Sequence, residues 1–375
     1  MGHLIIAIGQ AGCGILNSLL SHRRNWKLEM SDIFAINSDH VDFQRANKIP
    51  MDKWIGISEK KKDAITIEDA KTQGVGFADL IAGGYGNNAE AASKDAEIIA
   101  PKLVEKMMDM LPEKRKDSIN LILVIFSLGG GTGAGFGPAV VKELKKKHKY
   151  VIPLVIYPSI SEGKQRHENA IISLKNLYST TNTSIIFDNN ILTRRKKGLG
   201  LADFKIPNWI LAECIETMLF MPSLLSSGDA NTPVFDYKDF CTVLGLNERE
   251  EYIGCFGISL YIYNLLEALL RKPFADLNTI SRDQTINSIR RKMLIIDKAP
   301  EKIGVVIATK EKLYTRIKRD LINNKINGEV RRLEPDASDI KILEGFISHN
   351  TPSIRYVTLQ TYFFDDFKNE KEMEI

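Results

Sequence analysis

Five glycines and one threonine fall within seven residues of this 375-residue chain, in the run GGGTGAG at positions 129–135. The run follows an apolar segment at 121–127 and precedes a segment with helical spacing. Residues without a Cβ let successive backbone N–H groups gather around phosphate oxygens, and the following helix adds the positive end of its dipole. A merely structural turn would order these glycines at an entropic cost without a compensating contact. The Thr132 hydroxyl is available to a phosphate or a metal. The predicted phosphate contacts are Gly129, Gly130, Gly131, Thr132 and Gly133.

A second glycine turn, GQAGCG at 9–14, follows the first apolar segment and opens a helical pattern. It differs from the dinucleotide fingerprint G-x-G-x-x-G, because Ala11 replaces the second glycine and Asp39 lies too far along the chain for the usual ribose acid. An NAD-dependent oxidoreductase on a doubly wound sheet is an alternative, but it leaves GGGTGAG without a role. The predicted contacts in this turn are Gly9, Gln10, Ala11, Gly12 and Cys13.

Together the two turns resemble a known protein family. A GQAG turn after the first strand and GGGTGAG after a later strand form the double signature of tubulin, FtsZ and the archaeal CetZ proteins, and the chain is most similar to CetZ. The order of further motifs extends the resemblance to about Leu244, and beyond it only the pattern is similar. The resemblance implies a protein that binds GTP, polymerises head-to-tail with copies of itself into filaments and hydrolyses GTP to GDP on assembly. A role in cell shape or division is the corresponding expectation.

The resemblance also implies nucleotide contacts outside the two turns. GGYGNN at 83–88 stands where the family has the loop that cups the terminal phosphate, and SEGKQR at 161–166 matches its ribose loop. FDNN at 187–190 ends a strand like the family's guanine motif, and a carboxamide can both donate to and accept from a guanine edge. Each position also has an ordinary reading as a turn or helix-start residue. The implied contacts are Gly84, Gly86, Asn87 and Asn88 for the phosphate, Glu162 and Arg166 for the ribose and base, Asn189 and Asn208 for guanine, and Asn37 near the nucleotide.

None of the phosphate loops contains a general base, so a lone subunit should hydrolyse GTP poorly. In the family, a loop after the long helix reaches the neighbouring subunit's γ-phosphate, and VFDYKD at 234–239 fits that place. The resemblance therefore makes Asp236 and Asp239 the implied catalytic residues, able to hold an attacking water, with Mg²⁺ bound through the GTP phosphates. Val234 stands where FtsZ has an asparagine, so a nucleotide-binding scaffold with little hydrolysis is a second alternative. The motif G-x-x-x-x-G-K-[ST] is absent, which argues against a P-loop site.

The elements that must position these motifs follow from the apolar pattern. Short continuous apolar runs alternate with segments of helical spacing, which is typical of a parallel α/β sheet covered on both faces. Strands are expected at 4–8, 33–37, 121–127, 151–157 and 184–187. Helices are expected at 14–20, 89–110, 137–147 and 167–178, followed by a longer apolar helix at 207–225.

Beyond residue 228 the pattern changes to alternating runs, with strands expected at 252–263, 293–296, 303–308 and 355–362 and helices at 265–271 and 311–323. This change indicates a second, smaller α+β domain. The predicted fold is α/β, with a parallel-sheet GTPase domain of tubulin/FtsZ type joined by a long central helix to that smaller domain. The expected boundaries are 1–203 for the GTP-binding domain, 204–228 for the central helix, 229–362 for the α+β domain with the acidic loop, and 363–375 for an acidic mobile tail.

Composition bounds the partners and the compartment. A charged fraction of 26% and a net charge of +4 are ordinary, and the basic clusters lack interleaved aromatics, so direct nucleic-acid binding is not expected. Apolar runs are too short for membrane insertion, and the N-terminus has no basic leader, which favours the cytoplasm. The four cysteines lack the close pairing of a zinc site or a disulfide framework. The acidic tail could recruit an adaptor or simply be disordered.

Overall fold

The computed structural model describes most of the chain, and the chain divides into two compact units. Unit 1 comprises residues 1–23, 27–212 and 373–375, and unit 2 comprises 24–26 and 213–372. The division falls inside the segment predicted as the central helix, where α10 (Lys205–Ile215) continues into the π-helical turn η4 (Glu216–Phe220). The described residues are 2–21, 33–81, 83–190, 205–220, 237–262, 277–290, 292, 294, 296, 298–309, 319–333, 341–348, 353–371 and 373.

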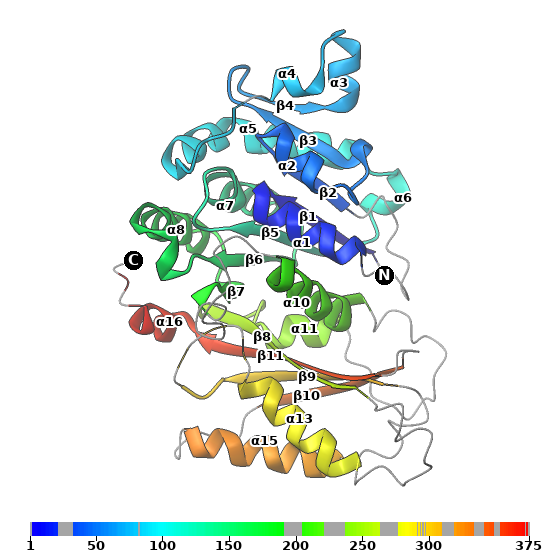
Figure 1. Ribbon diagram of the computed structural model, residues 1–375, viewed down its shortest axis with the longest axis vertical. Coiled ribbons are helices and arrows are strands. Elements are labelled where there is room, and N and C mark those ends of the chain that lie inside the picture. The colour runs from blue at the N-terminus through cyan, green and yellow to red at the C-terminus, as the bar shows by residue number, and fades with distance from the viewer. Residues whose placement is uncertain are drawn as a thin grey trace. The chain divides into compact units, whose positions relative to one another are not determined.

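Unit 1 is built on a mostly parallel sheet in the order β7-β6-β5-β1-β2-β3-β4, in which only β3 and β4 pair antiparallel (Figure 1). Every residue of β1, β2 and β6 is buried, which explains their continuous apolar sequences. From β1 the chain proceeds to β2 on one side and later to β5 on the other, so the sheet has a topological switch point between β1 and β5. The strands are β1 (Gly2–Ile8), β2 (Ile33–Asn37), β3 (Trp54–Ser58), β4 (Asp63–Thr66), β5 (Ile119–Ser127), β6 (Val151–Tyr157) and β7 (Thr183–Asp188).

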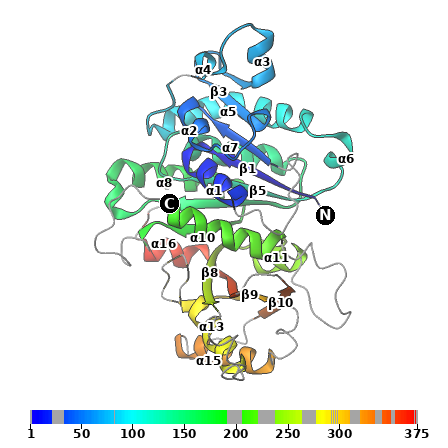
Figure 2. The same cartoon turned by 45° about the vertical axis from the view of Figure 1, so that its right-hand side comes forward.

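Helices cover both faces of this sheet, and α1 lies across β1 and β5 (Figure 1 and Figure 2). On one face, α1 approaches so closely that a Cβ on Gly12 would lie 2.3 Å from the carbonyl oxygen of Ile125. On the other face, α7 packs with Gly137 directly over the Phe126 ring, and α5 and α8 pack against α7. The helical segments are α1 (Gly9–Ser21), α2 (His40–Arg45), η2 (Met51–Lys53), α3 (Ile67–Thr72), α4 (Phe77–Leu80), α5 (Ala89–Asp109), α6 (Glu113–Lys116), α7 (Thr132–Lys145), η3 (Ile160–Glu162) and α8 (Lys164–Tyr178).

The segment between β2 and α5 forms structure that the sequence pattern did not predict. Strands β3 and β4 make a hairpin at the sheet edge, followed by the short helices α3 and α4. Phe43 of α2, Trp54 of β3 and Phe77 of α4 form an aromatic cluster in this segment. The centroids of the stacked Phe43 and Trp54 rings are 4.9 Å apart. Lys–Asp ion pairs then join this segment to α5. They are Lys62 to Asp95 at 2.5 Å, Lys102 to Asp63 at 3.4 Å and Lys106 to Asp69 at 2.5 Å.

Unit 2 contains a mixed sheet in the order β10-β9-β11-β8. Helix α13 packs on β8 and β11, and α15 packs on α13 (Figure 1). The runs predicted at 252–263, 303–308 and 355–362 correspond to three of the strands. No named strand includes the described residues of the run predicted at 293–296, and the neighbouring Lys292 forms an isolated bridge with Gly257. The helix predicted at 265–271 lies outside the described residues. The elements are α11 (Tyr237–Val243), β8 (Tyr252–Ile262), α13 (Leu277–Arg290), β9 (Lys302–Thr309), α15 (Arg319–Leu333), β10 (Lys341–Ser348), β11 (Ser353–Phe363) and α16 (Phe364–Glu370).

The prediction of a mobile acidic tail at 363–375 is wrong for most of its length. Residues Phe364–Glu370 form helix α16, and Phe364 and Phe367 are buried. Phe363 stacks on Tyr252 with ring centroids 5.4 Å apart. The aromatics thus anchor the segment to β8 and β11, and they do not form an exposed motif for an adaptor.

Candidate functional site

A cavity of about 600 Å³ opens in unit 1 at the carboxyl ends of β1 and β5, where the two glycine turns begin. This is the switch point of the sheet, the usual place for a ligand in an open α/β fold. The loop 83–88 and residues following β6 and β7 complete its wall. The sequence-predicted residues that line the cavity are Gly9, Gln10, Ala11, Asn37, Gly84, Gly86, Asn87, Gly129, Gly130, Gly131, Thr132, Gly133, Glu162, Arg166, Asn189 and Asn208.

The three glycine turns meet at positions that a Cβ would fill. Gly9 has φ +72°, and a Cβ there would lie 3.0 Å from the backbone nitrogen of Gly133. A Cβ on Gly131 would lie 2.9 Å from Cβ of Tyr85, in the third loop. Glycine is therefore required for the turns to approach one another, and their backbone groups are left to face the cavity.

The loop 83–88 has an unusual backbone that specific contacts hold in place. Gly83, Gly84, Gly86 and Asn87 all have positive φ, between 52° and 116°. The Tyr85 ring packs 5.6 Å from the Phe136 ring, and its hydroxyl donates to Asp95 of α5 at 2.8 Å. Burial and the Asp95 carboxylate raise the pKa of Tyr85, so it stays a neutral donor.

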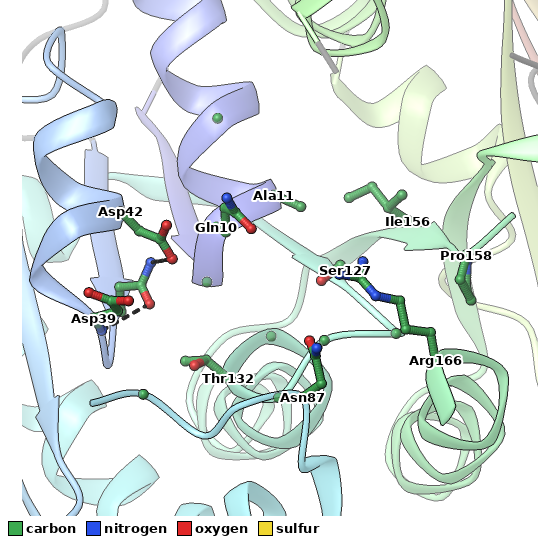
Figure 3. Close-up of a pocket in the computed structure, with 18 of the residues that line it drawn as sticks. Gln10, Ala11, Asp39, Asp42, Asn87, Ser127, Thr132, Ile156, Pro158 and Arg166 are labelled. Atoms are coloured by element: carbon green, nitrogen blue, oxygen red, sulfur yellow. Dashed lines mark hydrogen bonds between the residues drawn. The ribbon is translucent and has the colours of Figure 1, made fainter. Parts of the chain in front are cut away.

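Polar residues after β2 form one end of the cavity (Figure 3). Asn37 accepts from the backbone N–H of Ser38 at 2.8 Å and donates to Asp42 at 3.3 Å. Asp39 caps α2 by accepting from the Val41 N–H. Burial, and secondarily the charge of Asp39, raises the pKa of Asp42. Asp42 also lines the cavity and was not predicted to do so, although the polar run directly after a buried strand was a usable signal.

Arg166 and Pro158 lie at the opposite end of the cavity from Asp39 and Asp42 (Figure 3). Arg166 forms an ion pair with Glu162 at 2.8 Å, and the other Glu162 oxygen accepts from Asn189 at 2.9 Å and from the Ser159 N–H at 2.8 Å. Glu162 therefore organises this wall through its own protein partners, and a ligand hydroxyl would have to share its remaining lone pairs.

Comparison with known proteins agrees with this geometry. The family model "Tubulin/FtsZ family, GTPase domain" matches residues 3–195, just over half of the chain. The chain belongs to the tubulin/FtsZ family.

Two curated relatives illustrate the range of similarity within the tubulin/FtsZ family. Tubulin-like protein CetZ3 of Haloferax volcanii is 29% identical over 246 residues, which cover 64% of this chain and 57% of that protein. The chain thus aligns with less than two thirds of the length of that relative. Tubulin-like protein CetZ of Pyrococcus furiosus is 26% identical over 384 aligned residues, covering 100% of this chain and 93% of the relative.

Solved structures support the tubulin/FtsZ fold. CetZ2 from Haloferax volcanii, a GTPγS-bound protofilament, superimposes with a TM-score of 0.68 at 19% identity, covering 99% of this chain and 98% of that chain. CetZ1 from the same organism, a GDP-bound monomer, gives a TM-score of 0.65 at 18% identity, with 96% and 94% covered.

Three residues of this chain that were predicted to contact the nucleotide do not line the cavity. Gly12 instead permits the close packing of α1 on β5. Cys13 is buried, and this burial raises the pKa of its thiol to about 12. Asn88 caps α5 by accepting from the Ala91 N–H at 2.9 Å. Each of them supports an element next to the cavity.

Neither implied catalytic acid is among the residues that line the cavity as the structure describes it. Asp239 is in the first turn of α11 in unit 2, and Asp236 lies outside the described residues. Among the residues whose placement is described, no group of three or more His, Cys, Asp or Glu could hold a metal. Within the same part of the chain, no helix has the length and apolar character needed to cross a membrane.

Proposed function

We propose that this tubulin/FtsZ family member binds GTP in the cavity of unit 1 and hydrolyses it when subunits assemble into a filament. The observation that carries the proposal is the convergence of three glycine turns on one cavity at the switch point of the sheet. Helices α1 and α7 both begin at this cavity, so their N-terminal N–H groups and dipoles favour an anion there.

The phosphates are assigned to the glycine turns. Gly129–Gly131 and Gly9–Ala11 offer backbone N–H groups without Cβ atoms in the way, and Thr132 adds a hydroxyl. The terminal phosphate is assigned to Gly84, Gly86 and Asn87 because this loop closes the same end of the cavity, against Gly131. In this assignment loop 83–88 contacts the phosphate that GTP has and GDP lacks.

The nucleoside is assigned to the opposite end. Asn189 and Asn208 both line the cavity and carry carboxamides that suit a guanine edge. Asn208 lies against Gly14, where a Cβ would come within 2.7 Å of the Asn208 amide nitrogen. Glu162 and Arg166 are assigned to the ribose and base side, with Glu162 holding Asn189 in place.

The residues near the phosphate end also fit Mg²⁺ held mainly by phosphates and water. Ser38, Asp39 and Thr132 supply oxygen atoms, which are the ligands that Mg²⁺ prefers. When bound, Mg²⁺ would neutralise charge on the phosphate oxygens. The protein orients these oxygens itself: Ser38 and Thr132 hydrogen-bond each other, and Asp39 is held by the hydrogen bond that it accepts from the Val41 N–H.

Hydrolysis is assigned to a composite site between copies of the chain. No general base is among the side chains proposed to contact the terminal phosphate. We assign that role to Asp236 and Asp239 of the adjacent subunit, which would orient water for attack on the γ-phosphorus. The GTPγS-bound protofilament of CetZ2 supports assembly of copies of the chain, which we propose is head-to-tail. The proposal extends to a cytoplasmic role in cell shape or division, which the similarity to CetZ and FtsZ proteins supports.

Phosphate release per subunit, measured against protein concentration, tests this proposal. Catalysis in trans predicts that the specific rate rises steeply through the concentration at which light scattering reports polymer. A specific rate that is constant over this range would show that one subunit suffices and would contradict the composite site.

A further inference from the structure

Asn169 of α8 lies beneath the contact between two of the glycine turns. Its amide nitrogen is 2.7 Å from the carbonyl oxygen of Asn87 and 3.0 Å from that of Gly129. The side chain is only 1% exposed, and its amide oxygen accepts from Gln165 at 3.3 Å. One buried amide therefore joins loop 83–88 to the turn 129–131.

The chemistry of the partners fixes the orientation of this amide. Two carbonyl oxygens can only accept hydrogen bonds, so the atom between them must be the NH₂ group, which has two donors. A leucine of similar size would leave both carbonyls without this donor, and an aspartate would place an acceptor against two acceptors. Neither could replace the bridge, since a buried polar group left without a partner is costly.

The bridge also controls which backbone groups can turn toward the cavity. A trans peptide directs its C=O and the following N–H in opposite directions, so holding the Gly129 oxygen constrains the N–H of Gly130, a cavity-lining residue. The hydrogen bond from Asn169 to the Asn87 carbonyl likewise keeps that oxygen away from a site proposed to bind an anion. Loop 83–88 needs such a restraint because its three glycines give the backbone wide conformational freedom and Asn87 holds a positive φ of 64°.

We propose that Asn169 is a positioning residue that sets the spacing between these turns and thereby favours a nucleoside triphosphate over a diphosphate. The inference rests on the proposed assignment of loop 83–88 to the terminal phosphate. A diphosphate does not extend to that loop, so without the bridge it loses only the constraint on the turn 129–131, whereas a triphosphate also loses the held loop.

Ser173 provides the matched control. It lies one turn further along α8, is 0% exposed and donates to the backbone oxygen of Ala134 in α7 at 2.8 Å. Asn169 and Ser173 thus both join α8 to backbone carbonyls, but Ser173 touches neither turn through this bond. A purely structural role for Asn169 would make the two positions behave alike.

The test compares the wild type with Asn169→Leu, Asn169→Asp and Ser173→Ala. Competition with a fluorescent GDP analogue, below the polymerising concentration, gives Kd for GTPγS and for GDP. Hydrogen–deuterium exchange without nucleotide, confined to peptides from 83–88, reports the loop directly, and thermal unfolding verifies that each variant is folded.

We expect Asn169→Leu to weaken GTPγS binding at least tenfold and GDP binding less than threefold, with faster exchange in 83–88. Ser173→Ala should leave the ratio of the two Kd values within twofold of the wild type. Equal weakening of both nucleotides, or unchanged exchange in the loop, would overturn the role of Asn169. Wild-type protein that binds neither nucleotide would refute the proposed function itself, while the exchange result would still report whether Asn169 holds the loop.

Discussion

Oγ of Ser38 and Oγ1 of Thr132 lie 2.6 Å apart, although 94 residues separate them in sequence. The contact joins the end of β2 to the first residue of α7 at the wall of the cavity. Because either hydroxyl can donate, the pair can present one donor or acceptor to a phosphate oxygen or a metal-bound water. The contact therefore fixes the segment after β2 against the start of α7 at the proposed phosphate end of the site.

Replacing Thr132 by valine keeps its shape but removes the hydroxyl. We expect GTP affinity to fall about tenfold, since a lost hydrogen bond to a charged group is worth roughly 1.5–3 kcal/mol. Equilibrium titration with GTPγS measures the change, and Thr72→Val on the exposed side of α3 serves as the control. Unchanged affinity in the Thr132 variant would remove this residue from the site.

The parts of the fold that follow from local pattern could be predicted from the sequence. Strands β1, β2, β5, β6 and β7 have continuous apolar runs, and the glycine turns at 9–14 and 129–135 each lie between such a run and a helical pattern. Because carboxyl ends of parallel strands meet at one edge, the two main turns could be placed together without coordinates.

The rest depends on contacts between distant segments. The burial of Phe364 and Phe367 needs β8 and β11 as partners, so an acidic sequence alone suggested a tail. Gly12 cannot be told from a phosphate glycine until the Ile125 carbonyl is found against it. Asn169 looks like an ordinary polar residue of a helix until the two carbonyls appear.

Gly12→Ala should destabilise unit 1 through packing. The new Cβ would meet a backbone oxygen that cannot move as a side chain does, and overpacking of this kind costs about 1–3 kcal/mol. Calorimetry should show a lower unfolding temperature.

Gly328→Ala in α15 is the control and should raise the unfolding temperature, because its Cβ meets nothing within 4 Å and helix propensity improves by roughly 0.5–1 kcal/mol. A Gly12 variant as stable as the wild type would contradict the packing role.

Glu329 should make the stability of unit 2 depend on pH. Arg290 binds both of its oxygens at 2.8 Å and Arg332 adds a bond at 2.9 Å, which lowers the pKa of this carboxyl to about 2 from 4.5. A lowered pKa gives stability that is present above pH 4.5 and is lost as pH falls toward 2. Because both arginines are largely exposed, we expect Glu329→Gln to cost roughly 1–2 kcal/mol at pH 7.

The cost of Glu329→Gln should shrink steadily as pH falls below about 5. Thermal unfolding at several pH values measures it, with the exposed Glu370→Gln as the control. A difference between variant and wild type that is equally large at pH 7 and at pH 3 would assign the effect to packing instead of charge.

Asp239→Ala tests the assignment of catalysis. We expect GTP binding to be kept, turnover to slow by about 100-fold or more, and filaments to persist longer, because the acid acts on the neighbour's nucleotide and not on its own. Lys238→Ala, the adjacent exposed position of α11, is the control. Phosphate release and sedimentation report the two properties, and an Asp239 variant that failed to bind GTP would place the residue elsewhere in the mechanism.

Titration of the purified protein with GTP, ATP and NAD is the most direct measurement of whether the three glycine turns form a guanine-nucleotide site. We expect GTP to saturate at one per chain, GDP to compete with it, and ATP and NAD to bind far more weakly. Preferential binding of NAD, or GTP binding unaffected by Gly131→Ala, in which the new Cβ would collide with Tyr85, would contradict the assignment of these turns.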